Sequence, residues 1–588
     1  MQDHCHQKHE ADVAVIGGGL SGMLAAIAAA RHGARVVLMQ DRPVLGGNCS
    51  SEIRMWSLGC HGRNNEETGI LEEIFLENMY RNPTRNFSVW DSVLYEKVKA
   101  EPNITLLLNC SCCRLAMDGD RIRSVTGWQT TTYTWHTVEA KIFADCSGDS
   151  VLAPMCGAEY RMGREARGEY GEDIAPETAD RKTMGMTCMI QARETGRPSA
   201  FIPPEWAYVY PDDSCFPHRP HDLSDPTMNY WWMELGGEQD CIRDAEEIRD
   251  ELLKVAFGVW DHIKNRGDHH AENWELEWVG FLPGKRESIR YIGDYVMTQN
   301  DVQAGGHFED LAAYGGWTMD DHNPAGFRWP GEPTIHHPAP APFGIPYRSM
   351  YSRNIGNLMF AGRNISVTHT AMSASRVMST CAVIGQAVGT AAALAVSRGW
   401  TPRDVWKYGI GELQQMLMDD DCYLPGHTRQ VSELSRSAAL SGTGSSLEAL
   451  RSGADRPIGE EDNGCHIPLG GCAEYRFGGM RQVRGVRITF DSDLERETCT
   501  GHKVLRKYPM LCNRFLDMEP FGFPTVMVRQ FRVEYQDEAG NWRTAYRCAD
   551  NRQRLVRAEI NAAAQAVRLI PEETWGSPDA HLFAFEVN

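Results

Sequence analysis

Three glycines near the start of the chain have the residue type and the spacing needed to bind a phosphate group. Gly17, Gly19 and Gly22 form the pattern G-x-G-x-x-G. In this pattern the first glycine permits a tight turn, the second lets the backbone approach a pyrophosphate, and the third lets a helix pack on a strand. The spacing therefore predicts a dinucleotide site rather than an ordinary glycine-rich turn.

A strand and a helix on either side of these glycines must position such a site. The apolar run 13–16 is short enough to be one buried parallel strand. The alanine-rich segment after Gly19 predicts a helix that ends near Gly33, and the run 35–39 predicts a second buried strand. The free N–H groups and the dipole at the start of that helix would face the phosphates.

The residues after the second strand favour FAD over NAD. An acidic residue usually holds the ribose hydroxyls there, but this chain has Gln40, with Asp41 beside it. The following run x-x-L-G-G resembles the second glycine loop of FAD-dependent oxidoreductases with the glutathione-reductase type of nucleotide domain. The segment 41–62 resembles the family of FAD-dependent oxidoreductases distantly related to succinate dehydrogenase and fumarate reductase flavoproteins. The resemblance implies FAD contacts from Gln40, Asp41, Arg42, Gly46, Gly47, Asn48 and Ser51.

Two later stretches carry the same resemblance. After the apolar strand 140–144, the run DCSGD resembles the element where the chain returns to the nucleotide, although a plain turn would look similar. The stretch 357–395 resembles the C-terminal FAD motif, with a strand at 358–361 and a long helix from about residues 373–376. The start of that helix would stabilise the negative charge of a reduced flavin. The implied FAD contacts are Asp145, Gly148, Asp149, Gly362, Arg363 and Arg376.

Two histidines near these motifs are candidates for catalysis. Flavin carries out hydride transfer itself, so the protein must position a substrate and handle a proton. His369 is the first candidate, because a histidine in the corresponding loop of the succinate dehydrogenase group lies beside flavin and substrate. The spacing to Arg376 differs from that group. His61 could act as a base or tether FAD covalently; we expect noncovalent FAD.

Two polar loops farther along the chain supply two more candidates. Arg286, in the loop 284–290, could bind a carboxylate or stabilise a developing oxyanion. His322, in the loop 317–324, has acidic neighbours and could serve as a general base. Each could equally be part of an ordinary ion pair or a satisfied buried histidine.

The composition is that of a globular protein of several domains. The chain has 588 residues, of which 42% are hydrophobic and 23% charged. Its net charge of −20 argues against nucleic-acid and anionic-membrane partners. The 18 cysteines are scattered, the cluster 110–113 has no second half with zinc spacing, and we predict no metal site. The start of the chain, with His4, Cys5, His6 and His9, predicts a frayed polar tail without the apolar core of a signal peptide. We expect a cytoplasmic enzyme.

The predicted fold class is α/β, a Rossmann-like FAD-binding domain with an inserted α+β cap and a C-terminal all-β sandwich. The cap is rich in aromatic residues and contains an amphipathic helix at 240–265, whereas the run 382–395 predicts a buried helix too short for a bilayer. The last segments resemble a discoidin or galactose-binding-like jelly roll. The predicted domains are 10–160 (FAD-binding, first part), 161–340 (cap), 341–425 (FAD-binding, returning part), 426–453 (linker) and 454–588 (sandwich).

The expected function is hydride transfer between flavin N5 and a small organic substrate. The aromatic cap and the sandwich favour a carbohydrate or glycoside hydroxyl. A reductase of an unsaturated carboxylate is the alternative enzyme, and a non-catalytic carbohydrate-binding protein is the alternative outside enzymes. The electron acceptor is not identified, and a homo-oligomer is compatible with the sequence.

Overall fold

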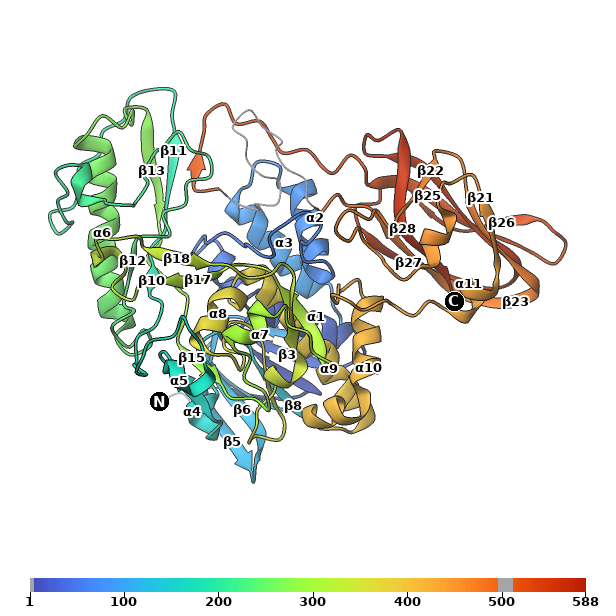
Figure 1. The fold of residues 1–588 in the computed structure, drawn as a ribbon, viewed down its shortest axis with the longest axis horizontal. Helices are drawn as coiled ribbons and strands as arrows, with labels where there is room; N and C mark the ends of the chain where they lie inside the picture. The colour runs from blue at the N-terminus through green and yellow to red at the C-terminus, as the bar shows by residue number, and fades with distance from the viewer. Residues whose placement is uncertain (1–4, 495–510) are drawn as a thin grey trace. The chain divides into compact units, whose positions relative to one another are not determined.

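The computed structural model describes residues 5–494 and 511–588, which fold as two compact units (Figure 1). Within the described chain, unit 1 comprises residues 5–61, 84–413 and 511–520. Unit 2 comprises residues 62–83, 414–494 and 521–588.

A five-stranded parallel sheet lies at the centre of unit 1. Its strands are short and apolar, and β2, β3 and β8 are buried along their whole length, as expected for a sheet covered on both faces. The last strand comes from far along the chain and pairs with β8, so the chain returns to this sheet after the cap. This sheet confirms the predicted α/β class. The order is β20 (Leu358–Phe360), β8 (Ile142–Asp145), β2 (Val13–Ile16), β3 (Val36–Met39) and β4 (Ile104–Leu107).

Helix α1 (Leu20–Arg31) packs closely against α9 (Met378–Arg398). A Cβ at Gly385 would lie 2.0 Å from the backbone oxygen of Ser21, and one at Gly389 would lie 2.1 Å from that of Ala25. The small residues of α9 are therefore required by the contact between the two backbones. By length and composition α9 could cross a membrane, but 94% of its apolar window is buried inside the structure, so it is a core helix of unit 1.

The long helix predicted from residues 373–376 is two helices in the structure. Helix α8 (His369–Ser375) ends at Arg376, and α9 begins at Met378. Val377 between them is extended, with φ −64° and ψ 147°, so the chain changes direction there. The break places residues 376–378 at the wall of a cavity.

The first described residues form the edge strand of a four-stranded sheet. Its order is β1 (Cys5–Glu10), β7 (Thr134–Glu139), β6 (Arg121–Gln129) and β5 (Cys110–Asp118). The predicted frayed tail is wrong for residues 5–10, because β1 pairs in parallel with β7 and His9 Nε2 lies 2.9 Å from His136 Nδ1. His4 lies outside the described residues. The remaining helices of this region are α3 (Phe87–Lys99), α4 (Ala153–Cys156), α5 (Arg167–Tyr170) and α7 (Gln299–Gln303); α10 (Pro402–Asp419) follows α9.

The cap consists of small sheets and one long helix, α6 (Ala245–Asn265), which packs against β12 and β13. This helix begins later than predicted, because Asp240 accepts hydrogen bonds from the N–H groups of Ile242 and Arg243 and forms a turn first. Strand β24 comes later in the chain than the first strands of unit 2, yet it pairs with β11. No sequence pattern predicts this pairing. The cap strands are β9 (Tyr160–Met162), β10 (Met186–Thr187), β11 (Ile190–Glu194), β12 (Glu234–Leu235), β13 (Trp274–Val279), β14 (Gly284–Lys285), β15 (Ile289–Tyr291), β16 (Leu311–Gly315), β17 (Met319–His322), β18 (Thr334–His337), β19 (Phe343–Pro346) and β24 (Asn513–Arg514).

Unit 2 is built on one sheet of long antiparallel strands. Its longest strands, β23 and β27, carry register shifts, for example between Val483 and Gly485, and such bulges bend a sheet over its core. Leu76 of α2 (Ile70–Arg81) packs in that core, so α2 belongs to unit 2, although the whole range 10–160 was predicted as FAD-binding domain. The strands are β21 (Ala439–Gly442), β22 (Cys465–Pro468), β23 (Ala473–Phe490), β25 (Val528–Gln536), β26 (Trp542–Cys548), β27 (Leu555–Thr574) and β28 (Asp579–Val587).

The range 426–453, predicted as a linker, contains ordered elements. It holds α11 (Glu433–Ser437), β21 and a 3-10 helix, η5 (Leu447–Arg451). Leu450 is fully buried in the core of unit 2, and Leu434 packs against that core. Burial of its few leucines therefore orders a segment whose Ser, Ala and Gly content is typical of linkers.

Candidate functional site

A cavity of about 1780 Å³ in unit 1 extends from the glycine loops into the cap. Its walls come from the ends of the central strands, from the start of α9 and from cap strands β14 and β17. Most of the predicted cofactor residues line it, as do three of the four catalytic candidates. The predicted residues that line it are Gly17, Gly19, Gln40, Asp41, Arg42, Gly46, Gly47, Asn48, His61, Gly148, Asp149, Arg286, His322, Gly362, Arg363 and Arg376.

The two glycine loops lie next to each other at one end of the cavity, where their backbones are in contact. The Gly46 N–H donates to the Gly18 carbonyl at 2.8 Å, and a Cβ on Gly19 would lie 3.9 Å from the Gly47 Cα. Among the described residues no side chain caps the first turn of α1, whose start lines the cavity. Free N–H groups beside an uncrowded backbone fit a pyrophosphate.

Gly22 is not among the described residues that line the cavity. A Cβ there would lie 1.8 Å from the Gly17 carbonyl oxygen, so Gly22 allows α1 to pack against the loop. This is the packing role that the motif predicts for its third glycine.

The amide of Gln40 is used inside the protein. Its Oε1 accepts a hydrogen bond from the Gly18 N–H at 2.7 Å, and its Nε2 donates to the Val44 carbonyl at 3.2 Å. Gln40 therefore fixes the shape of both glycine loops. Asp41, which is exposed and lines the same cavity, is the remaining candidate for the ribose hydroxyls.

Asp145 and Ser51 also lie outside the described lining of the cavity. Asp145 is fully buried and accepts hydrogen bonds from the Leu152 N–H at 2.9 Å and the Tyr291 hydroxyl at 2.6 Å. The Ser51 N–H donates to Asp91. The structure thus gives these two residues contacts within the chain, and these contacts support the loops that line the cavity.

Two cations share one carboxylate beside the turn 145–149. Asp149 accepts hydrogen bonds from Arg363 at 2.8 Å and from Lys285 at 2.7 Å. Burial alone would raise the pKa of Asp149, but the charges of Arg363 and Lys285 hold it below its ordinary value. Within the described chain, the Nε atoms of Arg363 and Arg376 are buried without a hydrogen-bond partner. Both arginines line the cavity, so their donors fit a bound polar group there.

The start of α9 is a second helix N-terminus at this cavity. Val377 and Met378 line it, and no side chain of the described residues caps this helix. The partial positive charge of an uncapped helix start stabilises an anion nearby. The predicted role of this helix beside a reduced flavin agrees with this position.

His322 lies at the end of β17 between two carboxylates. Its Nδ1 lies 2.6 Å from Glu234 Oε2, and its Nε2 lies 3.3 Å from Asp320 Oδ2. Glu234 is supplied by β12 and is buried. Burial would raise the pKa of Glu234, but Arg286 and His322 hold it below its ordinary value. A carboxylate only accepts hydrogen bonds, so Nδ1 donates to Glu234 and Nε2 donates to Asp320.

Two buried arginines complete the group around His322. Arg286 donates to the Thr187 hydroxyl at 2.6 Å and lies 3.4 Å from Glu234 Oε2, and Arg376 donates to Asp320 Oδ2 at 3.0 Å. Burial alone would raise the pKa of Asp320, but His322 and Arg376 hold it well below its ordinary value. Each arginine therefore already faces a carboxylate of the chain.

His61 lines the cavity and stacks on an aromatic ring. The His61 and Trp317 ring centroids are 4.1 Å apart with an interplanar angle of 20°. Stacking fixes the orientation of the imidazole at the cavity wall. The loop 317–324 therefore supplies both Trp317 and His322 to the site.

His369, the first catalytic candidate from the sequence, is not among the described residues that line the cavity. It is buried at the start of α8, with Nδ1 2.9 Å from Glu287 and Nε2 3.1 Å from Asp321. Burial would lower its pKa, but Glu287 and Asp321 raise it to about 10. With this pKa His369 is positively charged at neutral pH, and its ion pairs with Glu287 and Asp321 join the cap to α8.

Sequence reasoning missed several cavity residues. Lys285 and Trp231 line the cavity, and Glu234 orients His322 from behind. Cys110 and Cys112 line it as well. Of these residues, only Lys285 could have been predicted from the sequence, because it is next to Arg286.

The parallel sheet, the paired glycine loops and the returning strand define a dinucleotide-binding flavoprotein fold. The model of the family described as "FAD dependent oxidoreductase" matches residues 12–417, and the chain belongs to this family. FAD is therefore its cofactor, and oxidoreduction is its reaction class.

The chain also resembles individual proteins. A soluble pyridine nucleotide transhydrogenase of Marinobacter nauticus is 51% identical over 43 residues, 7% of this chain and 9% of that protein, so the chain spans only a small part of this relative. A geranylgeranyl bacteriochlorophyll reductase-like protein from Thermoplasma acidophilum has 11% identity and a TM-score of 0.32, covering 71% of this chain and 88% of its own. Quinol fumarate reductase from E. coli has 11% identity and a TM-score of 0.27, covering 76% of this chain and 77% of its own. A family 32 carbohydrate-binding module from Streptococcus pneumoniae has 15% identity and a TM-score of 0.20, covering 27% of this chain and 99% of its own.

Proposed function

We propose that the protein oxidises or reduces a neutral, hydroxyl-bearing small molecule such as a carbohydrate or glycoside. The observation that carries this proposal is the charge arrangement around His322, where two carboxylates already neutralise the two buried arginines. When bound, FAD supplies hydride exchange at N5. The residues of the chain bind and orient the substrate and move its proton.

The neutral character of the site disfavours a carboxylate substrate. Binding of a carboxylate by paired arginines requires guanidinium groups that are not already compensated. Here Arg286 faces Glu234 at 3.4 Å and Arg376 faces Asp320 at 3.0 Å. An added anion would meet two carboxylates as well as two cations, so the reductase of an unsaturated carboxylate is the weaker candidate.

His322 is the group that handles the proton. Glu234 accepts the Nδ1 hydrogen at 2.6 Å, and the Nε2 hydrogen faces Asp320 at 3.3 Å on the side where Asp320 lines the cavity. In reduction Nε2 gives its proton to the substrate oxygen, and in oxidation the neutral imidazole left by that step takes a hydroxyl proton back. The carboxylates of Asp320 and Glu234 stabilise the imidazolium that forms.

Two indole rings suit a sugar-like substrate. Trp231 and Trp317 both line the cavity, and the Trp231 ring centroid lies 5.1 Å from that of His322. Flat apolar faces beside a proton-transfer group would hold a ring whose hydroxyl points toward Nε2. The non-catalytic carbohydrate-binding alternative requires a protein that takes up no flavin.

The first measurement is the visible absorption spectrum before and after acid precipitation. A protein without flavin that takes up no added FAD would contradict the enzyme. Flavin retained in the precipitate would show a covalent bond and make His61 the candidate attachment site. Release into the supernatant would show noncovalent FAD.

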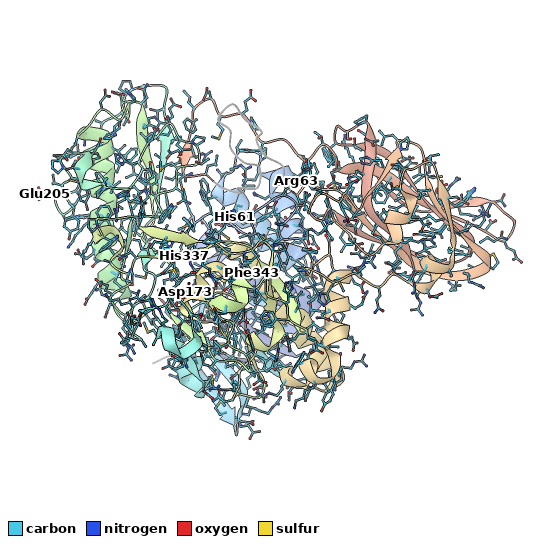
Figure 2. All side chains as sticks on the ribbon, in the orientation of Figure 1. His61, Arg63, Asp173, Glu205, His337 and Phe343 are labelled. Carbon is cyan, nitrogen blue, oxygen red and sulfur yellow. The ribbon has the colours of Figure 1, made fainter. Side chains whose placement is uncertain are left out.

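The substrate class is tested by anaerobic flavin bleaching with neutral sugars, glycosides and dicarboxylates. We expect bleaching by a neutral hydroxyl compound, slowed about 100-fold or more in His322→Gln. The matched control is His337→Gln, which changes a histidine of β18 outside the described cavity lining (Figure 2). Equal bleaching rates in wild type and His322→Gln would contradict the assigned role. Turnover of an unsaturated dicarboxylate instead would contradict the substrate class.

A further inference from the structure

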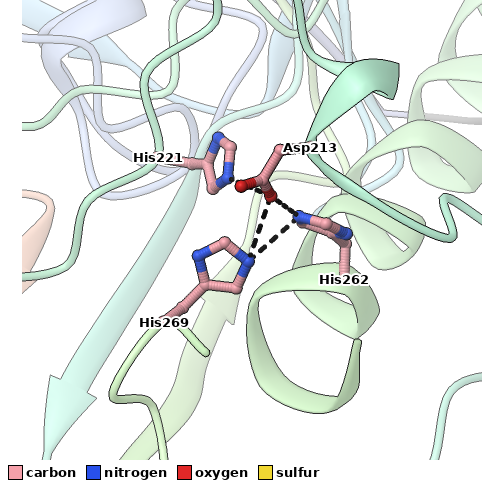
Figure 3. Close-up of side chains that lie close together, drawn as sticks. All are labelled: Asp213, His221, His262 and His269. Atoms are coloured by element: carbon pink, nitrogen blue, oxygen red, sulfur yellow. Dashed lines mark hydrogen bonds and ion pairs between the residues drawn. The ribbon is translucent and has the colours of Figure 1, made fainter. Parts of the chain in front are cut away.

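Three histidines and an aspartate converge on one point in the cap (Figure 3). Asp213 is in a 3-10 helix, η2 (Asp213–Cys215), His221 follows it, His262 is in the last turns of α6 and His269 is in the turn beyond. None of the four is among the described residues that line the flavin cavity. Their ligand atoms all lie within 4.8 Å of one another.

The distances are those of atoms that share a small ion. His262 Nε2 lies 2.9 Å from Asp213 Oδ1 and 3.0 Å from His269 Nε2. His269 Nε2 and His221 Nε2 lie 3.5 Å and 3.7 Å from the same carboxylate oxygen. Ligands of a tetrahedral Zn²⁺ about 2.0 to 2.1 Å from the metal are about 3.3 Å apart, which is the middle of this range.

Backbone carbonyls set the tautomer of two of the histidines. His262 Nδ1 lies 3.0 Å from the Tyr210 carbonyl oxygen, and His221 Nδ1 lies 2.9 Å from that of Arg219. A carbonyl only accepts, so each Nδ1 carries the hydrogen and each Nε2 directs a lone pair into the cluster. Metal-binding histidines are usually oriented by such contacts at the other ring nitrogen.

The cluster is buried on one side and open on the other. The ring of Phe216 lies 4.6 Å from that of His262, which is fully buried. A second cavity of about 580 Å³, lined by His221 and His269, gives access from outside. A metal ion can therefore reach ligand atoms that the protein already holds in place.

We propose that the Nε2 atoms of His221, His262 and His269 and the Asp213 carboxylate bind one divalent transition metal of the Zn²⁺ type. Four protein ligands fill a tetrahedral shell, so the site is structural. The metal joins the loop 213–221 to the end of α6, far apart in sequence. This proposal does not depend on the flavin chemistry.

The test measures metal in the full-length protein after passage over a chelating resin and titration with Zn²⁺. A second cluster in unit 2, Asp462, His466 and His581, could bind metal too, so all chains carry His466→Gln. We expect about one equivalent bound, with affinity about 100-fold weaker in His269→Gln and in Asp213→Asn. The matched control is His270→Gln, whose exposed side chain is next in sequence but outside the cluster.

Two further readouts separate loss of the site from loss of the fold. Co²⁺ in the parent chain, which carries only His466→Gln, should give the visible absorption of a tetrahedral site. The chain that also carries His269→Gln should lack this absorption while keeping its flavin content. Chelator should lower the melting temperature of the parent but not of His269→Gln. Absence of binding in the parent, or equal binding in the parent and His269→Gln, would overturn the proposal.

Discussion

Alanine at Gly19 and alanine at Gly22 should have different effects, although both glycines belong to one motif. Gly19 has φ −65° and ψ 176°, which any residue adopts, and among the described residues only the Gly47 Cα, at 3.9 Å, is near an added Cβ. Gly19→Ala should therefore fold as wild type. Its methyl group, however, enters the space between the glycine loops where we expect the pyrophosphate.

The geometry sets the size of each effect. A Cβ at Gly22 would lie 1.8 Å from the Gly17 carbonyl oxygen, whereas real Cβ contacts stay above 3.0 Å, so α1 must move by about 1.2 Å. Overpacking of this kind costs about 1 to 3 kcal/mol or more. At Gly19 we expect no loss of stability but a loss of FAD affinity of about 10- to 100-fold, which is about 1.4 to 2.8 kcal/mol.

The assay compares the melting temperature of each apoprotein with its dissociation constant for FAD, measured by quenching of flavin fluorescence. Gly168→Ala is the matched control, because its Cβ would have no described neighbour within 4 Å and it lies outside the described cavity lining. Wild-type FAD affinity in Gly19→Ala would refute the placement of the pyrophosphate. A wild-type melting temperature in Gly22→Ala would refute the packing role.

Three further predictions concern other parts of the chain. The pKa of His369 is raised from 6.5 to about 10, so its contribution to stability is complete below pH 6.5 and lost as the pH rises toward 10. Wild type should therefore lose about 2 kcal/mol more than His369→Gln between pH 6.5 and 8.5 in urea unfolding, and parallel pH profiles would contradict this. Leu76→Ala should destabilise unit 2 by about 2 to 5 kcal/mol in the same assay without changing FAD affinity, and an unchanged midpoint would show that α2 is not part of that core. Asp41→Ala should weaken FAD binding about 10-fold while Ser51→Ala leaves it unchanged, and equal titration curves would exclude Asp41 as the ribose contact.

The sequence predicts best where a local pattern decides the structure. The apolar run 13–16 is β2 as expected, and the spacing of Gly17, Gly19 and Gly22 places the first in the loop and the third against it. These features depend on residues close together in the chain. The cavity candidates Arg286 and His322 were found because charged residues gather in polar loops.

Other features depend on partners that are distant in sequence. The apolar stripe of α2 shows that one face is buried, but not that Leu76 packs in the core of unit 2. His369 is next to a cofactor motif in the chain, yet Glu287 and Asp321 hold its ring away from the cavity. The histidine cluster at His262 combines residues without any regular ligand spacing, so a search for metal motifs passes over it.

Two groups of paired charges at the cavity differ in net charge, and this difference suits an anionic cofactor and the proposed neutral substrate. Arg363 and Lys285 share the single carboxylate of Asp149, so this group of three carries one positive charge. Around His322, two arginines meet two carboxylates, and the sum is neutral. An excess cation attracts phosphate, whereas a compensated group offers directional hydrogen bonds without selecting an anion. This arrangement supports the proposal that FAD phosphates bind near Asp149 and that an uncharged hydroxyl meets the proton-transfer group His322.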